Sequence, residues 1–278
     1  MSGFSPEWLA LREPVDHRSR DAGLARRLTE HFAGKDRVRV VDLGCGSGSN
    51  LRATSGLLGP LQEWTLVDYD PRLLAAARAT LSAWADKIET NNGTVVLTKG
   101  ARQIMVRLRQ ADLNRELPAA LGETPDLVTA SALFDLCSTN FIDTFAKAVA
   151  QRHAAFYTVL TYDGVQDWRP AHAADASMLD AFRAHQMTDK GFGPSAGWTA
   201  PAALAKAFRM AGYTVGEATS PWILGEADAR LIADLASGFA DAVADTGKVS
   251  SDEIAAWRNV VRTAATVGHI DTLALPPG

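Results

Sequence analysis

Apolar positions along the chain form two patterns, runs typical of buried strands and stripes typical of helices. The segment 37–44 alternates between polar and apolar residues and ends mostly apolar, as a buried parallel strand should. Residues 21–33 place Leu24, Leu28 and Phe32 at helical spacing. By the same criteria the expected strands are 37–44, 63–70, 93–100, 103–113, 125–133 and 154–164, and the expected helices are 21–33, 49–58, 71–88 and 141–153. This order predicts an α/β fold with a mostly parallel sheet.

The chain after residue 165 follows a different pattern. A helix is expected at 176–187 and a glycine-rich loop at 189–198, and long loops in compact domains are often functional. Two alanine-rich helices are expected near the C-terminus. The last six residues, 273–278, are expected to form a frayed tail.

Composition narrows the classes of protein and partner. The 278 residues are 47% hydrophobic and 22% charged, which is ordinary for a globular chain that buries a core. The net charge of −4 does not suggest the basic face by which proteins usually bind nucleic acids. The two cysteines, Cys45 and Cys137, support neither a disulfide framework nor a zinc site. Because the N-terminus lacks an apolar signal region and no run approaches 18 apolar residues, we expect a cytoplasmic protein with no metal, membrane or nucleic-acid partner.

The first strand leads into a glycine-rich stretch, VVDLGCGSGSN, at residues 40–50. A dinucleotide-binding turn of the form G-x-G-x-x-G would require glycine at position 49, where the chain has Ser49. The spacing is instead G-x-G-x-G with Asp42 two residues before the first glycine. This pattern resembles motif I of the class I S-adenosylmethionine-dependent methyltransferases. Their cofactor has no pyrophosphate, so it needs no helix N-terminus for a double negative charge.

Three later segments extend the resemblance over about residues 38–165. Asp68 ends the second strand, where a carboxylate can accept both ribose hydroxyls, and Tyr69 follows where side chains stack on the adenine. Asp112 and Leu113 match the family's adenine-amino contact, and the segment 130–135 matches the strand end that lines the methyl-transfer site. The resemblance implies that the cofactor site comprises Asp42, Gly44, Cys45, Gly46, Gly48, Asn50, Asp68, Tyr69, Asp112, Leu113 and Ser131.

The same resemblance implies an architecture and a cofactor. The fold would be Rossmann-like, with a mostly parallel seven-stranded sheet, helices on both faces, an N-terminal helical cap and an inserted helix and loop. One domain is expected, with cap helices at 1–34, a cofactor-binding half at 35–165 and a substrate-side part at 166–278. The cofactor would be S-adenosylmethionine and the product S-adenosylhomocysteine. Each motif also has a purely structural interpretation: a glycine turn, a surface acid at Asp68 and a helix N-cap at Asp112. Four motifs in order favour the cofactor site.

The acceptor is less constrained by the sequence. The strand-four end reads ASALFDLCS, without the proline pair of nucleic-acid amino-methylating relatives, which favours a small-molecule acceptor. Candidate catalytic residues are Asp135, Tyr162 at a strand end, and His185 before the glycine-rich loop; a surface or helix-capping histidine is the alternative for His185. Further substrate contacts are expected from Arg12, Arg18, Asp163, Gln186 and Lys190, for which an exposed turn or a solvated charge is the alternative.

The motifs therefore predict the methyl donor and leave the acceptor atom open. An RNA or protein methyltransferase, a catalytically silent module that binds S-adenosylmethionine, and an NAD-dependent oxidoreductase are the alternatives. Ser49 in place of glycine argues against the last of these. The protein is expected to be a monomer or a homodimer.

Overall fold

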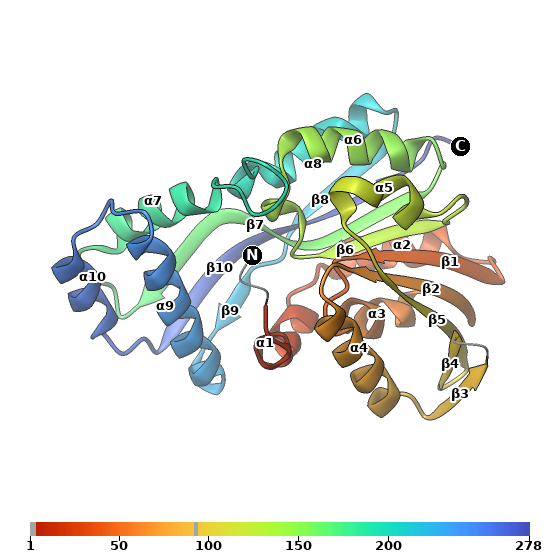
Figure 1. Ribbon diagram of the computed structural model, residues 1–278, viewed down its shortest axis with the longest axis horizontal. Helices are drawn as coiled ribbons and strands as arrows, with labels where there is room; N and C mark the ends of the chain where they lie inside the picture. Colours follow the sequence, from red (N-terminus) through yellow and green to blue (C-terminus); the bar gives the residue numbers. More distant parts are fainter. Residues whose placement is uncertain (1–3, 92–93) are drawn as a thin grey trace.

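A central β-sheet extends through the molecule (Figure 1). The computed structural model describes residues 4–91 and 94–278. The strands are β1 Arg37–Leu43, β2 Leu61–Asp68, β3 Lys87–Asn91, β4 Thr94–Lys99, β5 Arg102–Gln110, β6 Leu127–Ser131, β7 Ala155–Arg169, β8 Thr214–Thr219, β9 Trp222–Leu224 and β10 Ala264–Leu275. The described residues form one ten-stranded sheet of order β3-β4-β5-β2-β1-β6-β7-β10-β8, in which β9 pairs with β10 beside this path.

The centre of the sheet is parallel. Strands β5, β2, β1, β6 and β7 pair in parallel with one another, and the apolar residues of β1 are buried, as expected for strands covered on both faces. Leu43 at the end of β1 pairs with Val67 of β2 and Ala130 of β6, so these strand ends lie at one edge. In open α/β sheets, ligands bind at this carboxyl edge.

The flanks of the sheet are antiparallel and differ from the prediction of seven strands. The helix expected at 71–88 ends at Trp84, and β3 then pairs with β4 as an edge hairpin. At the other side β10 lies between β7 and β8. The sequence pattern does not predict this strand, and a frayed tail is expected at 273–278. That tail prediction is wrong for 273–275, because Leu273 is fully buried in β10. The buried polar residues His269 and Asp271 interrupt the apolar pattern that would have indicated this strand.

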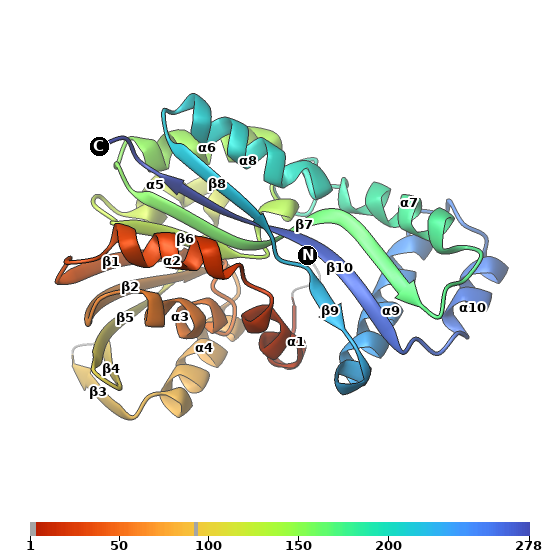
Figure 2. The same cartoon turned by 180° about the vertical axis from the view of Figure 1, so that it is seen from behind.

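Helices cover both faces of the sheet, as predicted for this fold class (Figures 1 and 2). The helices are α1 Pro6–Arg18, α2 Ala22–His31, α3 Ser49–Thr54, α4 Pro71–Trp84, α5 Leu113–Leu121, α6 Thr139–Ala150, α7 Asp175–Gln186, α8 Ala200–Met210, α9 Ala229–Ala244 and α10 Ser251–Arg258, with short 3₁₀ turns η1 Ser55–Leu57, η2 Phe134–Leu136, η3 Gly197–Thr199 and η4 Glu226–Asp228. Helices α5, α6 and α8 pack on one face through a core that includes Phe134, Phe145 and Phe208. Helix α2 packs on strands β8 and β10.

Strands β7 and β10 continue past the carboxyl edge and form what we call the arm, Thr161–Arg169 of β7 and Ala264–Ile270 of β10 together with β9 (Figure 2). The arm begins at Leu160, whose φ is 58° and whose N–H donates to Asp271 Oδ1 at 2.8 Å. Helices α7, α9 and α10 cover the arm, and Trp168, Phe239 and Trp257 form its aromatic core. The strand expected at 154–164 therefore extends five residues further, to Arg169.

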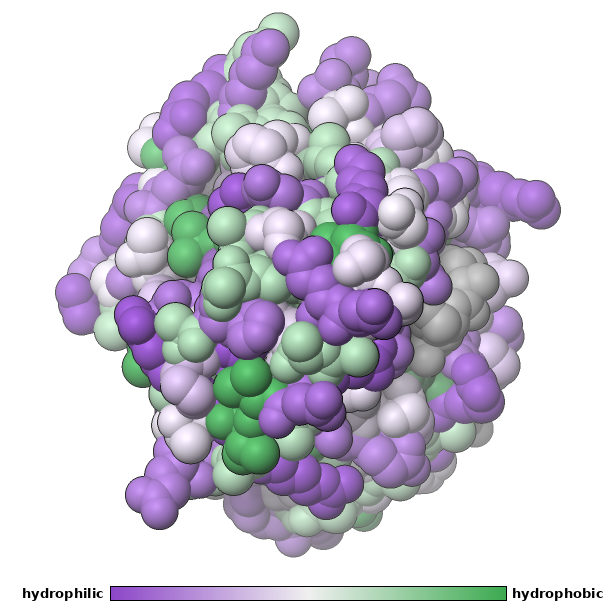
Figure 3. Space-filling model, turned by 90° about the vertical axis from the view of Figure 1, so that its left-hand side faces the viewer, coloured by the Kyte–Doolittle hydropathy of each residue, from purple (hydrophilic) through white to green (hydrophobic). Residues whose placement is uncertain are grey.

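The surface and the cysteines agree with a folded globular chain. Seen from the end formed by α7, α9 and α10, the surface is mostly hydrophilic, with small separate hydrophobic areas (Figure 3). Cys45 and Cys137 are both buried free thiols, and burial raises the pKa of each. Among the described residues, no helix has both the length and the apolar character needed to cross a lipid bilayer.

Candidate functional site

The glycine-rich turn follows β1 at the carboxyl edge of the sheet. All three glycines have left-handed backbone angles that favour glycine, with φ of 62° at Gly44, 53° at Gly46 and 79° at Gly48. The Cys45 N–H donates to the Val67 carbonyl at 3.0 Å, which attaches the turn to the end of β2. A Cβ added at Gly46 would lie 3.0 Å from Leu9 Cδ1, so α1 packs closely over the turn.

Asp68 supports this turn from the end of β2. Its Oδ2 accepts a hydrogen bond from the Gly46 N–H at 2.9 Å, and its Oδ1 accepts one from the Asp70 N–H at 2.9 Å. Burial raises the pKa of Asp68, although both backbone hydrogen bonds oppose the shift. The neighbouring Tyr69 is 58% exposed. The structure thus places Asp68 and Tyr69 beside the glycine-rich turn.

Asp112 lies at the same edge, after β5. The Ala111 N–H donates to the Asp68 carbonyl at 3.0 Å, which brings the ends of β2 and β5 together. Asp112 is the N-cap of α5 and accepts a hydrogen bond from the Asn114 N–H at 3.0 Å, while Leu113 is buried. The capping interpretation of Asp112 is therefore correct as a description of its local contact. A carboxylate has further acceptor positions, so capping does not occupy the whole group.

Asp42 is fully buried beneath the turn. Its Oδ1 accepts a hydrogen bond from Asn50 Nδ2 at 2.7 Å, and the same amide group donates to Thr129 Oγ1 at 3.1 Å. The side-chain oxygen of Asn50, Oδ1, accepts a hydrogen bond from Arg20 Nη1 at 3.0 Å. Burial raises the pKa of Asp42 to about 7. Asp42 and Asn50 thus belong to a buried polar network that joins the turn, β6 and the α1–α2 connection.

The end of β6 lies beside the turn and leads to the predicted catalytic residue Asp135. Ser131 is its last residue, and the chain then turns through Ala132, whose φ is 50°. Leu133 packs on the turn, because a Cβ at Gly44 would lie 3.2 Å from its Cδ1. Asp135 follows in η2 and is 8% exposed, and burial raises its pKa to about 6.

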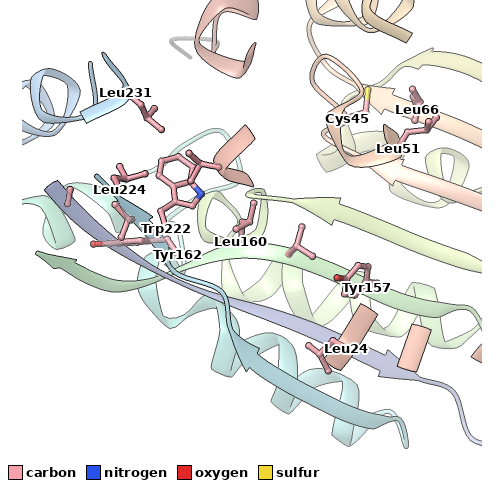
Figure 4. Packing of buried hydrophobic residues seen from close by; sticks show 14 of the residues in the cluster. Leu24, Cys45, Leu51, Leu66, Tyr157, Leu160, Tyr162, Trp222, Leu224 and Leu231 are labelled. Atoms are coloured by element: carbon pink, nitrogen blue, oxygen red, sulfur yellow. The ribbon is translucent and has the colours of Figure 1, made fainter. Parts of the chain in front are cut away.

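A group of largely buried polar and aromatic side chains lies beyond Leu133, between α1 and the arm. We call it the polar cluster, and it consists of Arg12, Asp16, Asp135, Tyr162, Trp222 and His269. Arg12 binds Asp16 through Nε at 2.9 Å and lies over the Trp222 ring at 5.0 Å. Tyr162 and His269 are cross-strand partners on β7 and β10. Figure 4 shows Tyr162 and Trp222 together on the arm, apart from Cys45 in the glycine-rich turn.

His269 is the principal member that sequence reasoning missed. It is 6% exposed, and burial lowers the pKa of its imidazole to about 3, so the ring is neutral at physiological pH. The signal available in the sequence was an isolated histidine inside the apolar stretch 264–275. Without a predicted strand at 264–275, an isolated histidine there does not indicate a position at the sheet edge.

The remaining predicted substrate residues lie outside the polar cluster. His185 contacts Lys190 at 3.3 Å and lies 3.9 Å from Asp245 at the end of α9. Arg18 is largely exposed and pairs with Asp228 at 2.7 Å. Asp163 accepts a hydrogen bond from the Val165 N–H at 2.9 Å, which is the turn role considered for it. Gln186 is the last residue of α7, and its backbone packs on Gly197 of η3.

The glycine-rich loop 189–198 crosses the carboxyl edge near the Asp112 end of the site. Asn114 Nδ2 donates to the Gly191 carbonyl, Phe192 packs edge-on against Phe141 at 4.8 Å, and Ser195 Oγ donates to the Leu136 carbonyl at 2.9 Å. The loop therefore borders the predicted cofactor site. It does so through its own residues and not through His185.

Two surface hollows are lined by residues other than those predicted to bind the cofactor. One shallow hollow is lined by Glu13, His17, Arg52, Thr80, Ala83 and Trp84, and another lies along α2. In the first, Arg52 is already engaged by the Glu13 carboxylate, the Ser47 carbonyl and Thr80. Within residues 4–91 and 94–278, no group of three or more histidine, cysteine and acidic residues is placed to hold a metal ion.

Comparison with known proteins bears on the fold. No protein-family model and no curated protein sequence matches the chain. Among solved structures it is similar to the YcgJ protein of Bacillus subtilis, with a TM-score of 0.51 and 13% identity over 94% of this chain and 100% of that one. The chain shares the fold of that protein, a central α/β sheet that is parallel at its centre. It is also similar to a putative methyltransferase from Bacillus halodurans, at a TM-score of 0.48 and 13% identity over 92% and 100% of the two chains.

The arrangement of strands and helices confirms the predicted α/β, Rossmann-like fold class. A third similar structure is the cyclopropane-fatty-acyl-phospholipid synthase-like protein from Lactobacillus casei, at a TM-score of 0.48 and 14% identity over 95% and 99% of the two chains. At such identities the likeness describes the arrangement of strands and helices. The roles of individual residues have to be argued from their own contacts.

Proposed function

We propose that this protein is an S-adenosylmethionine-dependent methyltransferase that acts on a small-molecule acceptor. The observation that carries the proposal is the meeting of three strand ends, those of β1, β2 and β5. The Gly46 N–H donates a hydrogen bond to the side-chain carboxylate of Asp68, and the Ala111 N–H donates one to the backbone carbonyl of Asp68. A glycine-rich turn and two carboxylates thereby surround one position at the ligand-binding edge of the sheet.

The residues at this position have the chemistry that the cofactor requires. Each Asp68 oxygen accepts one backbone hydrogen bond, and a carboxylate offers about four acceptor positions, so capacity remains for the ribose hydroxyls. Tyr69 exposes its ring beside Asp68, which suits stacking on a planar base. The left-handed φ of 53° at Gly46, which glycine adopts without strain, brings its N–H to the Asp68 carboxylate. S-adenosylmethionine, when bound, supplies an activated methyl group; the chain has to orient it and exclude water.

The acceptor side supports a small molecule. Asp135, Tyr162 and His269 are 8%, 6% and 6% exposed, so a macromolecule cannot reach them without the arm moving away from α1. A small molecule requires only a local opening. The cytoplasmic location and the monomeric or dimeric state remain predictions from the sequence.

Isothermal titration calorimetry with S-adenosylhomocysteine and NADH tests the proposal. We expect S-adenosylhomocysteine to bind and NADH not to bind. Asp68→Asn removes the carboxylate charge and should weaken S-adenosylhomocysteine binding. A hydrogen bond to a charged group contributes about 1.5–3 kcal/mol, so we expect Kd to rise roughly 10- to 150-fold. Asp143→Asn, at an exposed position on α6, is the matched control and keeps the wild-type Kd. Preferential binding of NADH, or equal affinity in Asp68→Asn and wild type, would contradict the assignment.

A further inference from the structure

Three buried polar atoms of the polar cluster lack a hydrogen-bond partner among the residues that the structure describes. They are Asp135 Oδ1, Tyr162 OH and His269 Nδ1. Buried polar groups in folded proteins are nearly always paired, and an unpaired one costs about 1–3 kcal/mol. These three come from η2, β7 and β10. Tyr162 and His269 are cross-strand partners whose ring centroids lie 6.4 Å apart, and η2, which carries Asp135, packs on β7. A ligand bound at these atoms would pair all three.

The donor and acceptor character of these atoms restricts the ligand. An ionised carboxylate only accepts hydrogen bonds, a neutral imidazole accepts at one nitrogen, and a phenol does either. The imidazole of His269 is neutral because burial lowers its pKa to about 3. Arg12, the cationic member of the polar cluster, directs Nε and Nη2 to Asp16 at 2.9 and 3.3 Å. The ligand therefore has to supply hydrogen-bond donors.

The charges facing the cluster point in the same direction. Arg12 and Asp16 form an ion pair, and Asp16 also accepts a hydrogen bond from Trp222 Nε1 at 3.1 Å. On α7, Arg183 donates to the Gly164 carbonyl at 2.8 and 3.0 Å. Asp135 is left as a buried carboxylate without a directly bonded cation. Because a buried charge is costly unless paired, a cationic ligand relieves this cost and an anionic ligand increases it.

We propose that the polar cluster is the acceptor pocket and that it binds an amine in its protonated form, with Asp135 as the ionic partner and Tyr162 and His269 as further hydrogen-bond partners. This inference rests on the proposed function. The reaction balances as follows. The Asp135 carboxylate takes one proton from the ammonium group, and the freed nitrogen lone pair forms a bond to the methyl carbon. The carbon–sulfur bond breaks with its electron pair remaining on sulfur, which leaves S-adenosylhomocysteine and a methylated ammonium. The proton on Asp135 then passes to water.

Binding of three probes of similar size tests the charge preference without requiring turnover. Phenethylamine, 3-phenylpropionate and 3-phenyl-1-propanol are titrated calorimetrically into the protein loaded with S-adenosylhomocysteine at pH 7.5. We expect the amine to bind at least tenfold more tightly than the acid and the alcohol. Equal or tighter binding of either of those two, or no binding of the amine, overturns the proposal.

Variants then locate the amine. Asp135→Asn is expected to weaken phenethylamine binding at least tenfold and to leave the Kd of S-adenosylhomocysteine unchanged. Asp167→Asn, an exposed carboxylate on the same strand as Tyr162, is the control and keeps both affinities. Tyr162→Phe removes one hydroxyl and should weaken the amine severalfold, which keeps the test valid if Asp135→Asn does not fold. Unchanged amine affinity in Asp135→Asn, or in Tyr162→Phe where that is the variant that folds, overturns the proposal.

The two proposals fail in different ways. Absence of S-adenosylhomocysteine binding contradicts the proposed methyltransferase and says nothing against an amine pocket. In that case the three probes are titrated into the protein alone, with the same expected order. Normal S-adenosylhomocysteine binding without a preference for the amine contradicts only the pocket assignment.

Discussion

Replacing Asp42 with asparagine isolates the cost of burying a charge beneath the glycine-rich turn. The side chain is fully buried, accepts one hydrogen bond from Asn50 Nδ2 at 2.7 Å, and leaves Oδ2 without a partner in the described chain. Burial raises its pKa from the ordinary value of 3.8 to about 7. At about 1.4 kcal/mol per pKa unit, a rise of about 3 units means that ionised Asp42 destabilises the folded state by on the order of 4 kcal/mol.

The sign follows from where each state binds the proton. Below the unfolded pKa of 3.8 the carboxyl group is protonated in both states, and its burial carries no charge cost. Between 3.8 and about 7 the unfolded chain ionises while the folded protein keeps the proton, so the free energy of unfolding falls as the pH rises. Above about 7 the loss is complete. Asp42→Asn does not ionise, and its amide oxygen can still accept the hydrogen bond from Asn50.

Urea unfolding followed by tryptophan fluorescence at pH 4.5, 6, 7 and 8 measures this difference. We expect the stability of Asp42→Asn relative to wild type to rise by about 3 kcal/mol across that range, because about 1 kcal/mol of the full effect already lies below pH 4.5. Asp143→Asn, an exposed acid on α6, should follow the wild-type profile. Other buried acids contribute to both curves and cancel in the difference. Parallel profiles for wild type and Asp42→Asn, or a variant that loses relative stability with rising pH, would refute the reasoning.

Three other perturbations have definite expected outcomes. Gly46→Val combines a φ of 53° with a Cβ 3.0 Å from Leu9, so it should abolish S-adenosylhomocysteine binding in calorimetry and cost at least about 1–2 kcal/mol in urea unfolding; wild-type affinity would contradict the crowded turn. Asn50→Ala leaves Asp42 and Arg20 without a shared buried partner and should lower the free energy of unfolding by about 2–4 kcal/mol; a change under about 0.5 kcal/mol would show that the network is dispensable. Removing residues 273–278 shortens β10 and should unfold the protein, whereas removing 276–278 leaves β10 intact and should not; circular dichroism measures the difference. Equal stability of the two truncated proteins would restore the frayed-tail interpretation.

The part of the molecule that carries the proposed cofactor site was predictable because its signals are local. The turn at 44–48 needs left-handed backbone angles that glycine supplies, and the strand before it alternates between polar and apolar residues and ends mostly apolar. Asp68 and Asp112 each follow a predicted strand, and parallel strands bring their carboxyl ends to one edge. The position of these residues therefore followed from spacing along the chain. The alternative role of Asp112 as an N-cap was also readable from the sequence, since capping depends on neighbouring backbone groups.

The acceptor side was not predictable because its contacts join segments far apart in the sequence. Arg12 and Asp16 come from α1, Trp222 from β9 and His269 from β10, and the first and last of these lie more than 250 residues apart. Helix α1 has no apolar stripe, and β10 buries His269 and Asp271, so neither element shows the periodicity by which helices and strands are recognised. The sequence suggests a catalytic role for His185 because it precedes the glycine-rich loop. In the structure its neighbours are Lys190 and Asp245, outside the polar cluster.

By itself the sequence determined the parallel centre of the sheet, the glycine-rich turn and the edge at which a ligand would lie, because each depends on residues a few positions apart. Only the tertiary structure decided which side chains face that edge from the far side. Strand β10 returns through the sheet between β7 and β8 and carries His269 to Tyr162, a pairing that depends on long-range register and not on local pattern.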